Sequence, residues 1–274
     1  MNVSIPIEHN ELDRINLRTM RAAEVVAEYA RQDELLAHER VVLDRVADEC
    51  RNAPILELGV GGGRAVQALL GISRDYLGID YSPEMVAACQ QRFPQVHFAL
   101  GDARSMPGLA DASFKLVVFC CNGISMVGHE DRLAILREVR RVLKPGGILL
   151  FTTYNRDCPE AVAGFRWPVF APSINPLRLA VRGLRFARDA WASMLNRRRF
   201  RRHEQRTTHY AIINDACHNH GVMLYYITVD EQRRQLEQLG FEGRSPAFDR
   251  DGEPIREHSR LDSMAFIARK PLVA

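Results

Sequence analysis

The spacing of hydrophobic and polar residues changes near residue 51. Between residues 12 and 51, apolar side chains recur in a polar background that contains no glycine or proline, which predicts two or three helices. After residue 51, short apolar runs that end in glycine or aspartate alternate with segments of helical spacing. Strands that alternate with helices predict a doubly wound α/β fold, in which a mostly parallel sheet carries helices on both faces.

The alternating region predicts a sheet of seven strands. Short buried strands are expected at residues 55–58, 76–79, 96–100, 115–120 and 148–153, separated by helices at 65–70, 82–92 and 130–143. The alternation breaks after residue 153 and resumes with a helix at 229–239 and strands near 241–246 and 264–268. The C-terminal end of the chain therefore completes the sheet.

Residues 156–228 form an insertion between these two parts of the core. Apolar residues from 177 to 195 recur at helical spacing, which predicts one amphipathic helix over 175–196. Residues 210–213 and 222–227 flank a polar stretch, as in a β-hairpin. We divide the chain into an N-terminal helical cap (1–50), a core (51–155 and 229–274) and an inserted lid or substrate region (156–228).

The composition is that of an ordinary folded protein, with 46% hydrophobic and 26% charged residues and a net charge of +3. This balance speaks against disorder, and no overall field favours nucleic acid as a partner. The six cysteines include no CxxC pair, residues 1–11 lack the apolar core of a signal peptide, and no apolar run is long enough to span a membrane. We expect free thiols and a cytoplasmic protein with at most peripheral membrane contact.

Three glycines mark the turn after the first predicted strand. Gly59, Gly61 and Gly63 allow the backbone to turn tightly and to approach a ligand at the carboxyl edge of the sheet. A turn of this kind also serves nucleotide phosphates, so it does not identify the ligand alone. Glu57 at the strand end would repel a pyrophosphate but can accept from an ammonium group. Asp80 ends the next strand, where a carboxylate can accept from both hydroxyls of a ribose.

Asp102 follows the third predicted strand and is placed to accept from an adenine amino group. Together, these segments resemble the S-adenosylmethionine-dependent methyltransferases with a Rossmann-like fold. The resemblance covers residues 51–153 and, more weakly, 229–270. It is carried by residues 57–63, 78–82, 101–103, 115–118 and 141–147.

The resemblance implies S-adenosylmethionine as cofactor and S-adenosylhomocysteine as product. The methionyl end of the cofactor would lie at residues 59–63, with the ribose at Asp80. Tyr29 resembles the tyrosine that many relatives place over the cofactor, although an aromatic residue on a helix also suits a core position. The remaining cofactor candidates surround the adenine or end the fourth strand: Tyr81, Met85, Asp102, Ala103 and Cys120, the last of which also suits a buried structural role.

Methyl transfer makes few demands on the protein, because a sulfonium already activates the methyl group. The protein must align the acceptor, exclude water and sometimes remove a proton. No metal is expected, since nothing completes a set around His218 and His220 beyond Asp215 and Cys217. Candidate substrate-binding residues are Asn122, Tyr154 and Asn155. Candidate catalytic residues are His129, His209, Tyr210, Tyr225 and Tyr226, of which neighbours along a strand point to opposite faces.

These features predict a methyltransferase that acts on a nitrogen or oxygen of a small molecule, distantly similar to the glycine and sarcosine N-methyltransferases. Residues 120–125 contain no Asn-Pro-Pro-Tyr or Asp-Pro-Pro-Tyr, which speaks against DNA amino groups and glutamine as acceptors. A lipid or quinone-like acceptor at a membrane surface, and a non-catalytic cofactor-binding protein, are the alternatives. The arginines at 178, 182 and 185 suit a solvated lid helix, a membrane surface, an anionic partner or RNA. Monomer and homodimer stay open.

Overall fold

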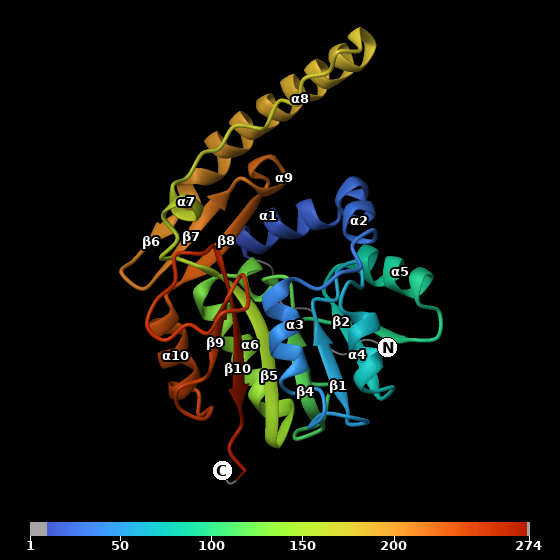
Figure 1. The fold of residues 1–274 in the computed structure, drawn as a ribbon, viewed down its shortest axis with the longest axis vertical. Coiled ribbons are helices and arrows are strands. Elements are labelled where there is room, and N and C mark those ends of the chain that lie inside the picture. The colour runs from blue at the N-terminus through green and yellow to red at the C-terminus, as the bar shows by residue number, and fades with distance from the viewer. Residues whose placement is uncertain (1–9, 273–274) are drawn as a thin grey trace.

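The computed structural model describes residues 10–272, and it contains the predicted doubly wound sheet (Figure 1). Five parallel strands lie in the order β3-β2-β1-β4-β5. Strand β10 runs antiparallel to β5, and β9 pairs with the outer side of β10. The bounds are Ile55–Leu58 (β1), Tyr76–Asp80 (β2), His97–Leu100 (β3), Phe114–Phe119 (β4), Leu143–Asn155 (β5), Ala247–Asp249 (β9) and Ser263–Arg269 (β10).

One predicted strand is misplaced. The strand expected near residues 241–246 occurs at Ala247–Asp249 (β9). The preceding segment turns instead, with Gly240 at a φ of 79° and Arg244 at a φ of 53°. A strand cannot contain such left-handed positions in its interior, so the regular pairing with β10 begins at Ala247, and the earlier segment makes only isolated hydrogen bonds to β10. The expectation for residues 1–9, that they form no signal peptide, lies outside the described residues.

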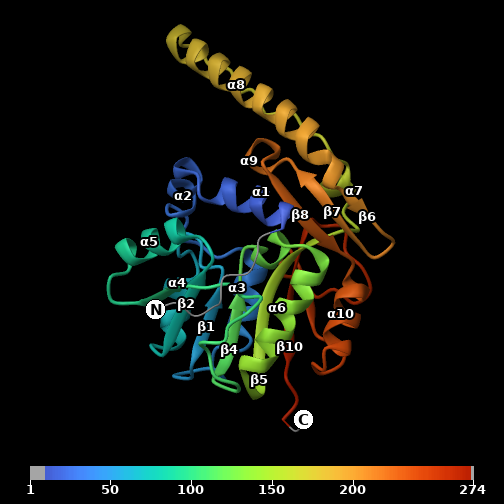
Figure 2. The same cartoon turned by 180° about the vertical axis from the view of Figure 1, so that it is seen from behind.

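Helices cover both faces of the sheet, as the alternating sequence predicts. Helices α3, α4 and α5 pack on one face, and α6 and α10 pack on the other, which Figure 2 shows from behind. Alternate residues of each central strand belong to opposite cores, so both faces are apolar. The bounds are Ala37–Asp44 (α3), Val66–Ile72 (α4), Pro83–Arg92 (α5), His129–Val142 (α6) and Val229–Gln238 (α10).

Two further N-terminal helices, Glu11–Met20 (α1) and Ala23–Tyr29 (α2), lie beyond the carboxyl ends of the strands (Figure 1). The side chain of Asn10 caps α1 by accepting from the backbone N–H of Asp13 at 3.0 Å. Asn16 is fully buried; its amide donates to the carbonyls of Met126 (2.6 Å) and Met223 (2.8 Å), and its oxygen accepts from the N–H of Met223 (2.7 Å). Asn16 thus joins α1 to two other segments.

The insertion adds a hairpin to the sheet and a long projecting helix. Strands β7 and β8 form the predicted antiparallel hairpin, and the end of β8 pairs in parallel with the end of β5, beyond the last residue of β4. The long helix α8 extends away from the body in Figures 1 and 2. The bounds are Pro159–Val162 (α7), Pro176–Phe200 (α8), Arg201–His203 (η2), Gln205–Arg206 (β6), Tyr210–Asp215 (β7), Cys217–His220 (α9) and Val222–Ile227 (β8).

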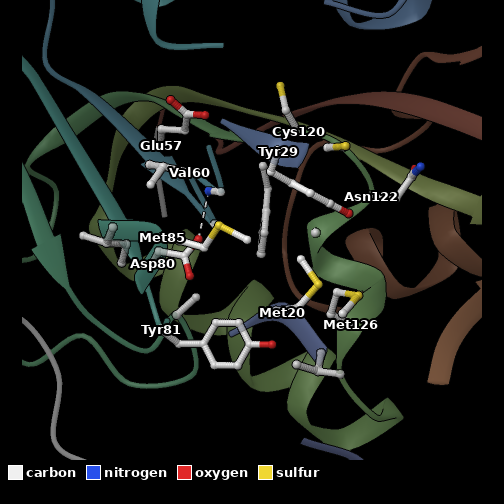
Figure 3. Close-up of a pocket in the computed structure, with 18 of the residues that line it drawn as sticks. Met20, Tyr29, Glu57, Val60, Asp80, Tyr81, Met85, Cys120, Asn122 and Met126 are labelled. Carbon is white, nitrogen blue, oxygen red and sulfur yellow. Dashed lines mark hydrogen bonds between the residues drawn. The ribbon is translucent and has the colours of Figure 1, made fainter. Parts of the chain in front are cut away.

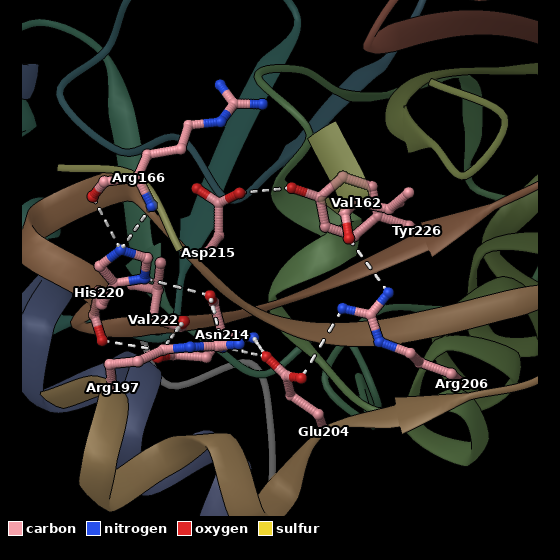
Figure 4. A network of polar contacts seen from close by, with 10 residues as sticks. All are labelled: Val162, Arg166, Arg197, Glu204, Arg206, Asn214, Asp215, His220, Val222 and Tyr226. Carbon is pink, nitrogen blue, oxygen red and sulfur yellow. Dashed lines mark hydrogen bonds and ion pairs between the residues drawn. The ribbon is translucent and has the colours of Figure 1, made fainter. Parts of the chain in front are cut away.

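A polar network fixes the root of α8 to the hairpin (Figure 4). Glu204 pairs with Arg197 and accepts from the backbone N–H of Asn214 at 3.2 Å. The buried amide of Asn214 donates to the carbonyls of His220 (2.8 Å) and Val222 (3.0 Å), which closes the hairpin turn. Since most of these groups are buried and partnered, the network fixes the direction in which α8 leaves the body.

Replacement of Asn16 tests whether α1 is held by its buried amide. Asn16→Ala leaves the carbonyl of Met126 and both backbone groups of Met223 without their partner, so the free energy of unfolding should fall by about 2–4 kcal/mol. Urea denaturation measures this change. The matched control is Gln90→Ala on the exposed side of α5, which should change stability by less than about 0.5 kcal/mol. A loss below about 1 kcal/mol for Asn16→Ala would contradict the assignment.

Candidate active site

A pocket lies at the carboxyl ends of β1 to β4, beneath α1 and α2 (Figure 3). It is partly open to solvent and extends from the ends of β1 and β2 to the hairpin β7–β8. Its walls come from the strand ends, the two N-terminal helices and the hairpin β7–β8. The carboxyl edge of a parallel sheet is where α/β folds place their ligands.

The glycine turn forms the floor of the pocket next to β1. Gly59 and Gly61 line it, with φ angles of 61° and 54° that favour glycine. A side chain at Gly59 would meet the ring of Phe119 at 2.6 Å. Gly63, also predicted here, does not line the pocket; its α-carbon faces the ring of Phe93, which a Cβ would approach to 2.7 Å. Gly63 therefore serves the packing of α5.

Gly62 was expected only as part of the turn at residues 59–63, and the structure gives it a specific place in the pocket wall. A Cβ at this position would lie 2.2 Å from the backbone carbonyl of Tyr29. The glycine thus allows the end of α2 to rest directly on the turn, which brings the Tyr29 ring into the pocket wall. The run of three consecutive glycines was the available signal.

Asp80, at the end of β2, points its carboxylate into the pocket and is 6% exposed. Its Oδ2 accepts from the backbone N–H of Gly61 at 2.9 Å, and its Oδ1 accepts from that of Ser82 at 2.8 Å. Burial raises the pKa of Asp80 to about 6, and these two N–H groups limit the rise. The carboxylate is held in place on one side and faces the pocket with the other.

Glu57 is a second buried carboxylate in the same wall. Its Oε2 accepts from the hydroxyl of Tyr76 at 2.6 Å. Burial raises the pKa of Glu57 to about 7, against the lowering effect of the Tyr76 hydroxyl and of Arg64. A buried carboxylate of this kind favours a cationic ligand group, because a nearby positive charge offsets the cost of ionising it.

The predicted adenine side is formed by Tyr81, Met85, Asp102 and Ala103, all of which line the pocket. The carboxylate of Asp102, however, is already engaged by Arg104, which donates from Nη2 at 2.7 Å and from Nε at 3.0 Å. Arg104 also pairs with Asp13 of α1 at 2.5 Å. No pattern in the sequence indicated Arg104, because its partner on α1 is distant along the chain.

The end of β4 closes the pocket with an unusual backbone. Cys121 and Asn122 both have a φ of 54°, a left-handed pair that turns the chain sharply after Cys120. Burial raises the pKa of the Cys120 thiol well above its ordinary value, so Cys120 lines the pocket as a neutral group. Asn122 also lines the pocket, and its Oδ1 accepts from the hydroxyl of Ser263 at 3.1 Å.

The predicted substrate residues separate into two groups. Asn122 and Tyr154 line the pocket, whereas Asn155 does not. The amide of Asn155 is buried and donates to the carbonyls of Ser259 (2.7 Å) and Leu261 (2.8 Å). Successive residues of β5 point to opposite faces, so only one of Tyr154 and Asn155 can reach the pocket. Asn155 is a structural residue.

None of the predicted catalytic residues lines the pocket. His129 stacks on Tyr210 with ring centres 4.4 Å apart and lies 2.8 Å from the hydroxyl of Tyr225, so these three form a cluster elsewhere. The hydroxyl of Tyr226 donates to Asp215 at 2.5 Å, and the exposed His209 lies 4.0 Å from Glu231. The alternation of β8 accounts for Tyr225, which faces away from Val222 and Leu224. Tyr226 shares the face of these two residues but does not line the pocket, and its hydroxyl is held by Asp215.

The part of the pocket between α1 and the hairpin is mostly apolar, and its lining residues are not among the substrate-binding and catalytic candidates named from the sequence. Its polar member is His218, whose ring centre lies 6.0 Å from that of Tyr29. Burial lowers the pKa of His218, so its imidazole is neutral near pH 7. The other residues of this wall are Met20, Met126, Val127, Cys217, Val222 and Leu224. Residues of α8 do not contribute, so the helix predicted as a lid does not cover the pocket here.

Comparison with known proteins agrees with this geometry. Residues 55–147 match the family model of a methyltransferase domain. A "Probable S-adenosylmethionine-dependent methyltransferase" of Mycolicibacterium smegmatis is 35% identical over 120 residues, which are 43% of this chain and 44% of that protein. Residues 55–147 are thus similar in sequence to methyltransferase domains.

A second curated relative and one solved structure extend the comparison. The demethylmenaquinone methyltransferase of Chlorobaculum parvum is 36% identical over 98 residues, 35% of this chain and 39% of that protein. The crystal structure of an S-adenosylmethionine-dependent methyltransferase from Clostridium acetobutylicum superposes with a TM-score of 0.59 at 11% identity, covering 86% of this chain and 91% of that one. At that identity the likeness shows the fold. The chain spans less than half the length of the first curated relatives it matches.

The first curated relatives are named as S-adenosylmethionine-dependent methyltransferases, and the pocket residues of this chain fit that cofactor. The turn at Gly59 and Gly61 leaves space that a side chain would fill, and two buried carboxylates face that space. We propose that Glu57 accepts from the ammonium group and that Asp80 accepts from the ribose hydroxyls. In the described part of the chain, no three histidine, cysteine, aspartate or glutamate side chains are grouped to hold a metal ion.

Replacement of Asp80 tests the proposed ribose contact. Asp80→Ala should weaken S-adenosylhomocysteine binding between several-fold and a hundredfold, because about 1–3 kcal/mol of charge-assisted hydrogen bonding is lost. Calorimetric titration measures the affinity. Asp75→Ala is the matched control, since Asp75 is exposed and directly precedes the opposite end of β2. Equal affinities of Asp80→Ala and the wild type would remove Asp80 from the site.

The raised pKa values of Glu57 and Asp80 predict a pH dependence of binding. The cofactor's ammonium and hydroxyl groups interact with the ionised carboxylates, so affinity should be highest above pH 7. It should fall as protons add to Glu57 at about pH 7 and to Asp80 at about pH 6. Titrations of S-adenosylhomocysteine between about pH 5 and about pH 8 measure both steps. Glu57→Gln should remove the upper step alone, and a pH-independent affinity in the wild type would refute the assignment.

Proposed function

We propose that this protein transfers a methyl group from S-adenosylmethionine to a nitrogen or oxygen atom of a small-molecule acceptor. The observation that carries the proposal is the continuation of the pocket past the cofactor residues into the apolar space between α1 and the hairpin β7–β8. A cofactor-binding protein without an acceptor has no need for this second space. The numerous methyltransferase relatives support the reaction class.

The apolar space suits an acceptor with a substantial hydrophobic surface. Met20, Met126, Val222 and Leu224 offer side chains with no strong hydrogen-bonding group. Methionine side chains adapt their shape to irregular ligands. The wall therefore selects by shape and apolar contact, and leaves polar recognition to a few residues.

Polar contacts to the acceptor would come from Asn122, Tyr154 and His218. Burial raises the pKa of Tyr154 well above its ordinary value, so its hydroxyl stays protonated and can donate a hydrogen bond. His218 is neutral near pH 7 and can take a proton from an acceptor hydroxyl or ammonium group. We propose Asn122 and Tyr154 as orienting residues and His218 as the proton acceptor.

Methyl transfer also needs a dry site with a fixed geometry. S-adenosylmethionine supplies an activated methyl group when it is bound. The chain's own contribution is to hold the reactants in line and to exclude water. Helix α1, tied down by Asn16 and by the pair of Asp13 with Arg104, covers the sheet edge, and the Tyr29 ring at the end of α2 narrows the entrance.

A quinone or lipid-like acceptor is a second candidate. The apolar wall favours it, and one relative is named as a demethylmenaquinone methyltransferase. Both candidates predict the same chemistry at the cofactor and differ in the size of the acceptor. An acceptor panel separates them.

The test is release of S-adenosylhomocysteine with a panel of phenols, hydroquinones with and without a prenyl tail, and primary and secondary amines. Release should depend on one class of acceptor and should fall in Asp80→Ala when the cofactor is not saturating. Binding of S-adenosylhomocysteine without release on any acceptor, in the panel or in a metabolite extract, would contradict the proposal and favour a non-catalytic binding protein.

A matched pair of histidine variants tests the proposed proton acceptor in the same assay. His218→Asn keeps a side chain that tolerates the left-handed backbone at this position, where φ is 50°. It should lower kcat by about a hundredfold and alter the loss of kcat that the wild type shows at low pH. The affinity for S-adenosylhomocysteine should be retained. His129→Asn, outside the pocket, should change kcat by less than about threefold. Equal effects of the two variants would exclude His218 from catalysis.

A further inference from the structure

Residues 164–203 form an arm that stands away from the body (Figures 1 and 2). An extended segment runs outward to residue 175, and α8 returns over 25 residues. The two halves hold each other through Phe170 against Phe186, with ring centres 5.5 Å apart, and through Arg182, which donates to the carbonyls of Ala171 and Pro172. Only Ser193 and Phe200 of α8 are buried. The arm is therefore anchored at its root and exposed along its length.

One face of α8 presents a continuous apolar stripe to solvent. Leu177, Val181, Leu184, Trp191 and Leu195 are between 41% and 75% exposed. Their spacing of three, four or seven residues places them on the same side of the helix. An exposed stripe of this length has no counterpart on the other described helices and indicates a binding surface.

Both tryptophans of the chain lie in the arm. Trp191 is on the stripe and is 63% exposed, and Trp167 is in the outward segment and is 58% exposed. Val169 and Ile174, also in the outward segment, are almost entirely exposed. Tryptophan combines a large apolar ring with a polar N–H, which suits the boundary between water and lipid.

The arm is also strongly basic. Ten arginines and a single acidic residue, Asp189, lie between residues 164 and 203, whereas the whole chain has a net charge of only +3. Arg178 and Arg185 follow Leu177 and Leu184 by one position, so they lie about 100° around the helix from the stripe. A cationic flank beside an apolar stripe with tryptophan is the pattern of helices that lie in a membrane interface.

We propose that the arm binds the surface of a bilayer that contains anionic lipids. The arginines would contact the headgroups while the stripe and the tryptophans enter the boundary of the acyl chains. A second copy of the chain is disfavoured as the occupant, because pairing two arms would bring like charges together. Nucleic acid would leave the leucines and valine of the stripe exposed.

This inference goes beyond the proposed function and places the pocket relative to the membrane. The root of α8 packs on α9, where Asn196 donates to the carbonyl of Asn219 at 2.9 Å. The neighbouring residues Cys217 and His218 line the pocket. A bound arm would therefore hold the acceptor side of the pocket near the lipid surface. No described helix is long and apolar enough to cross a bilayer.

Intrinsic fluorescence tests the proposal directly, because every tryptophan of the chain reports on the arm. The full chain is titrated with phosphatidylcholine vesicles and with vesicles that also contain about a third phosphatidylglycerol. Binding should shift the emission to the blue, and partitioning should be at least about tenfold stronger on the anionic vesicles and weaken in high salt. No shift with anionic vesicles at low salt would overturn the proposal, as would equal shifts with both compositions.

Matched variants assign the binding to the arm in vesicle flotation. Arg178→Glu with Arg185→Glu should reduce partitioning about tenfold or more, and Leu184→Ser with Leu195→Ser should do the same while both tryptophans are kept. Arg74→Glu with Arg137→Glu, two exposed arginines of the core, is the charge control and should bind as the wild type does. Retained S-adenosylhomocysteine affinity shows that each variant is folded and that the cofactor site is intact.

Two results would replace the proposal with another occupant. Concentration-dependent dimerisation in sedimentation, abolished by Leu184→Ser with Leu195→Ser and accompanied by no vesicle binding, would assign the stripe to a second copy. Tighter binding to single-stranded RNA than to anionic vesicles, lost in Arg178→Glu with Arg185→Glu, would assign the charge to nucleic acid. Failure of the vesicle test leaves the cofactor and turnover experiments unaffected, since these use the core.

Discussion

The pocket depends on the attachment of α1 across the carboxyl edge of the sheet. Asn16 is fully buried and makes three hydrogen bonds to backbone groups of η1 (Gly123–Met126) and β8. Burying an amide costs free energy unless its hydrogen-bonding groups find partners, so the amide of Asn16 favours one position of α1 on the sheet edge. The pair of Asp13 with Arg104 acts in the same way at the end of β3, where desolvation offsets much of the Coulomb attraction. These contacts position α1 and thereby form the roof of the pocket.

The electrostatics of the pocket follow from covering that edge. Glu57 and Asp80 are taken out of water together, and burial raises the pKa of both. For an acid whose folded pKa lies above its unfolded one, the ionised form opposes folding, so each group lowers stability as pH rises toward its folded pKa. A ligand with an ammonium group and hydroxyl donors relieves this cost. The carboxylates that weaken the empty fold therefore strengthen cofactor binding.

Local sequence pattern was sufficient for the fold and for the residues on the strand ends. Glycines follow β1, and an aspartate ends β2. Because parallel strands end at the same edge of a sheet, Gly59, Gly61 and Asp80 meet in the pocket. The hairpin was also predicted, from two apolar segments that flank a polar stretch. The sequence did not show which residues of β8 face the pocket, because this depends on how β8 pairs with the end of β5, a long-range contact. The sequence therefore left open which of Tyr225 and Tyr226 faces the site, whereas Val222 and Leu224 line it.

Other differences have the same origin. Arg104 joins Asp13 to Asp102 across a long stretch of chain, and no local pattern indicates such a pair. The amphipathic spacing of α8 correctly predicted a helix, but it suits equally a helix folded onto a pocket and one exposed to another surface. The network around Glu204 and Asn214 decides between them by directing the helix outward.

The crystal structure of the complex with S-adenosylhomocysteine tests the central claim most directly, because it locates every contact at once. The structure predicts the ribose hydroxyls within hydrogen-bond distance of the Asp80 carboxylate, the amino group near Glu57, and the sulfur directed toward the space between Met20 and Leu224. A ligand bound away from Asp80 and Glu57, or a sulfur directed away from that space, would contradict it.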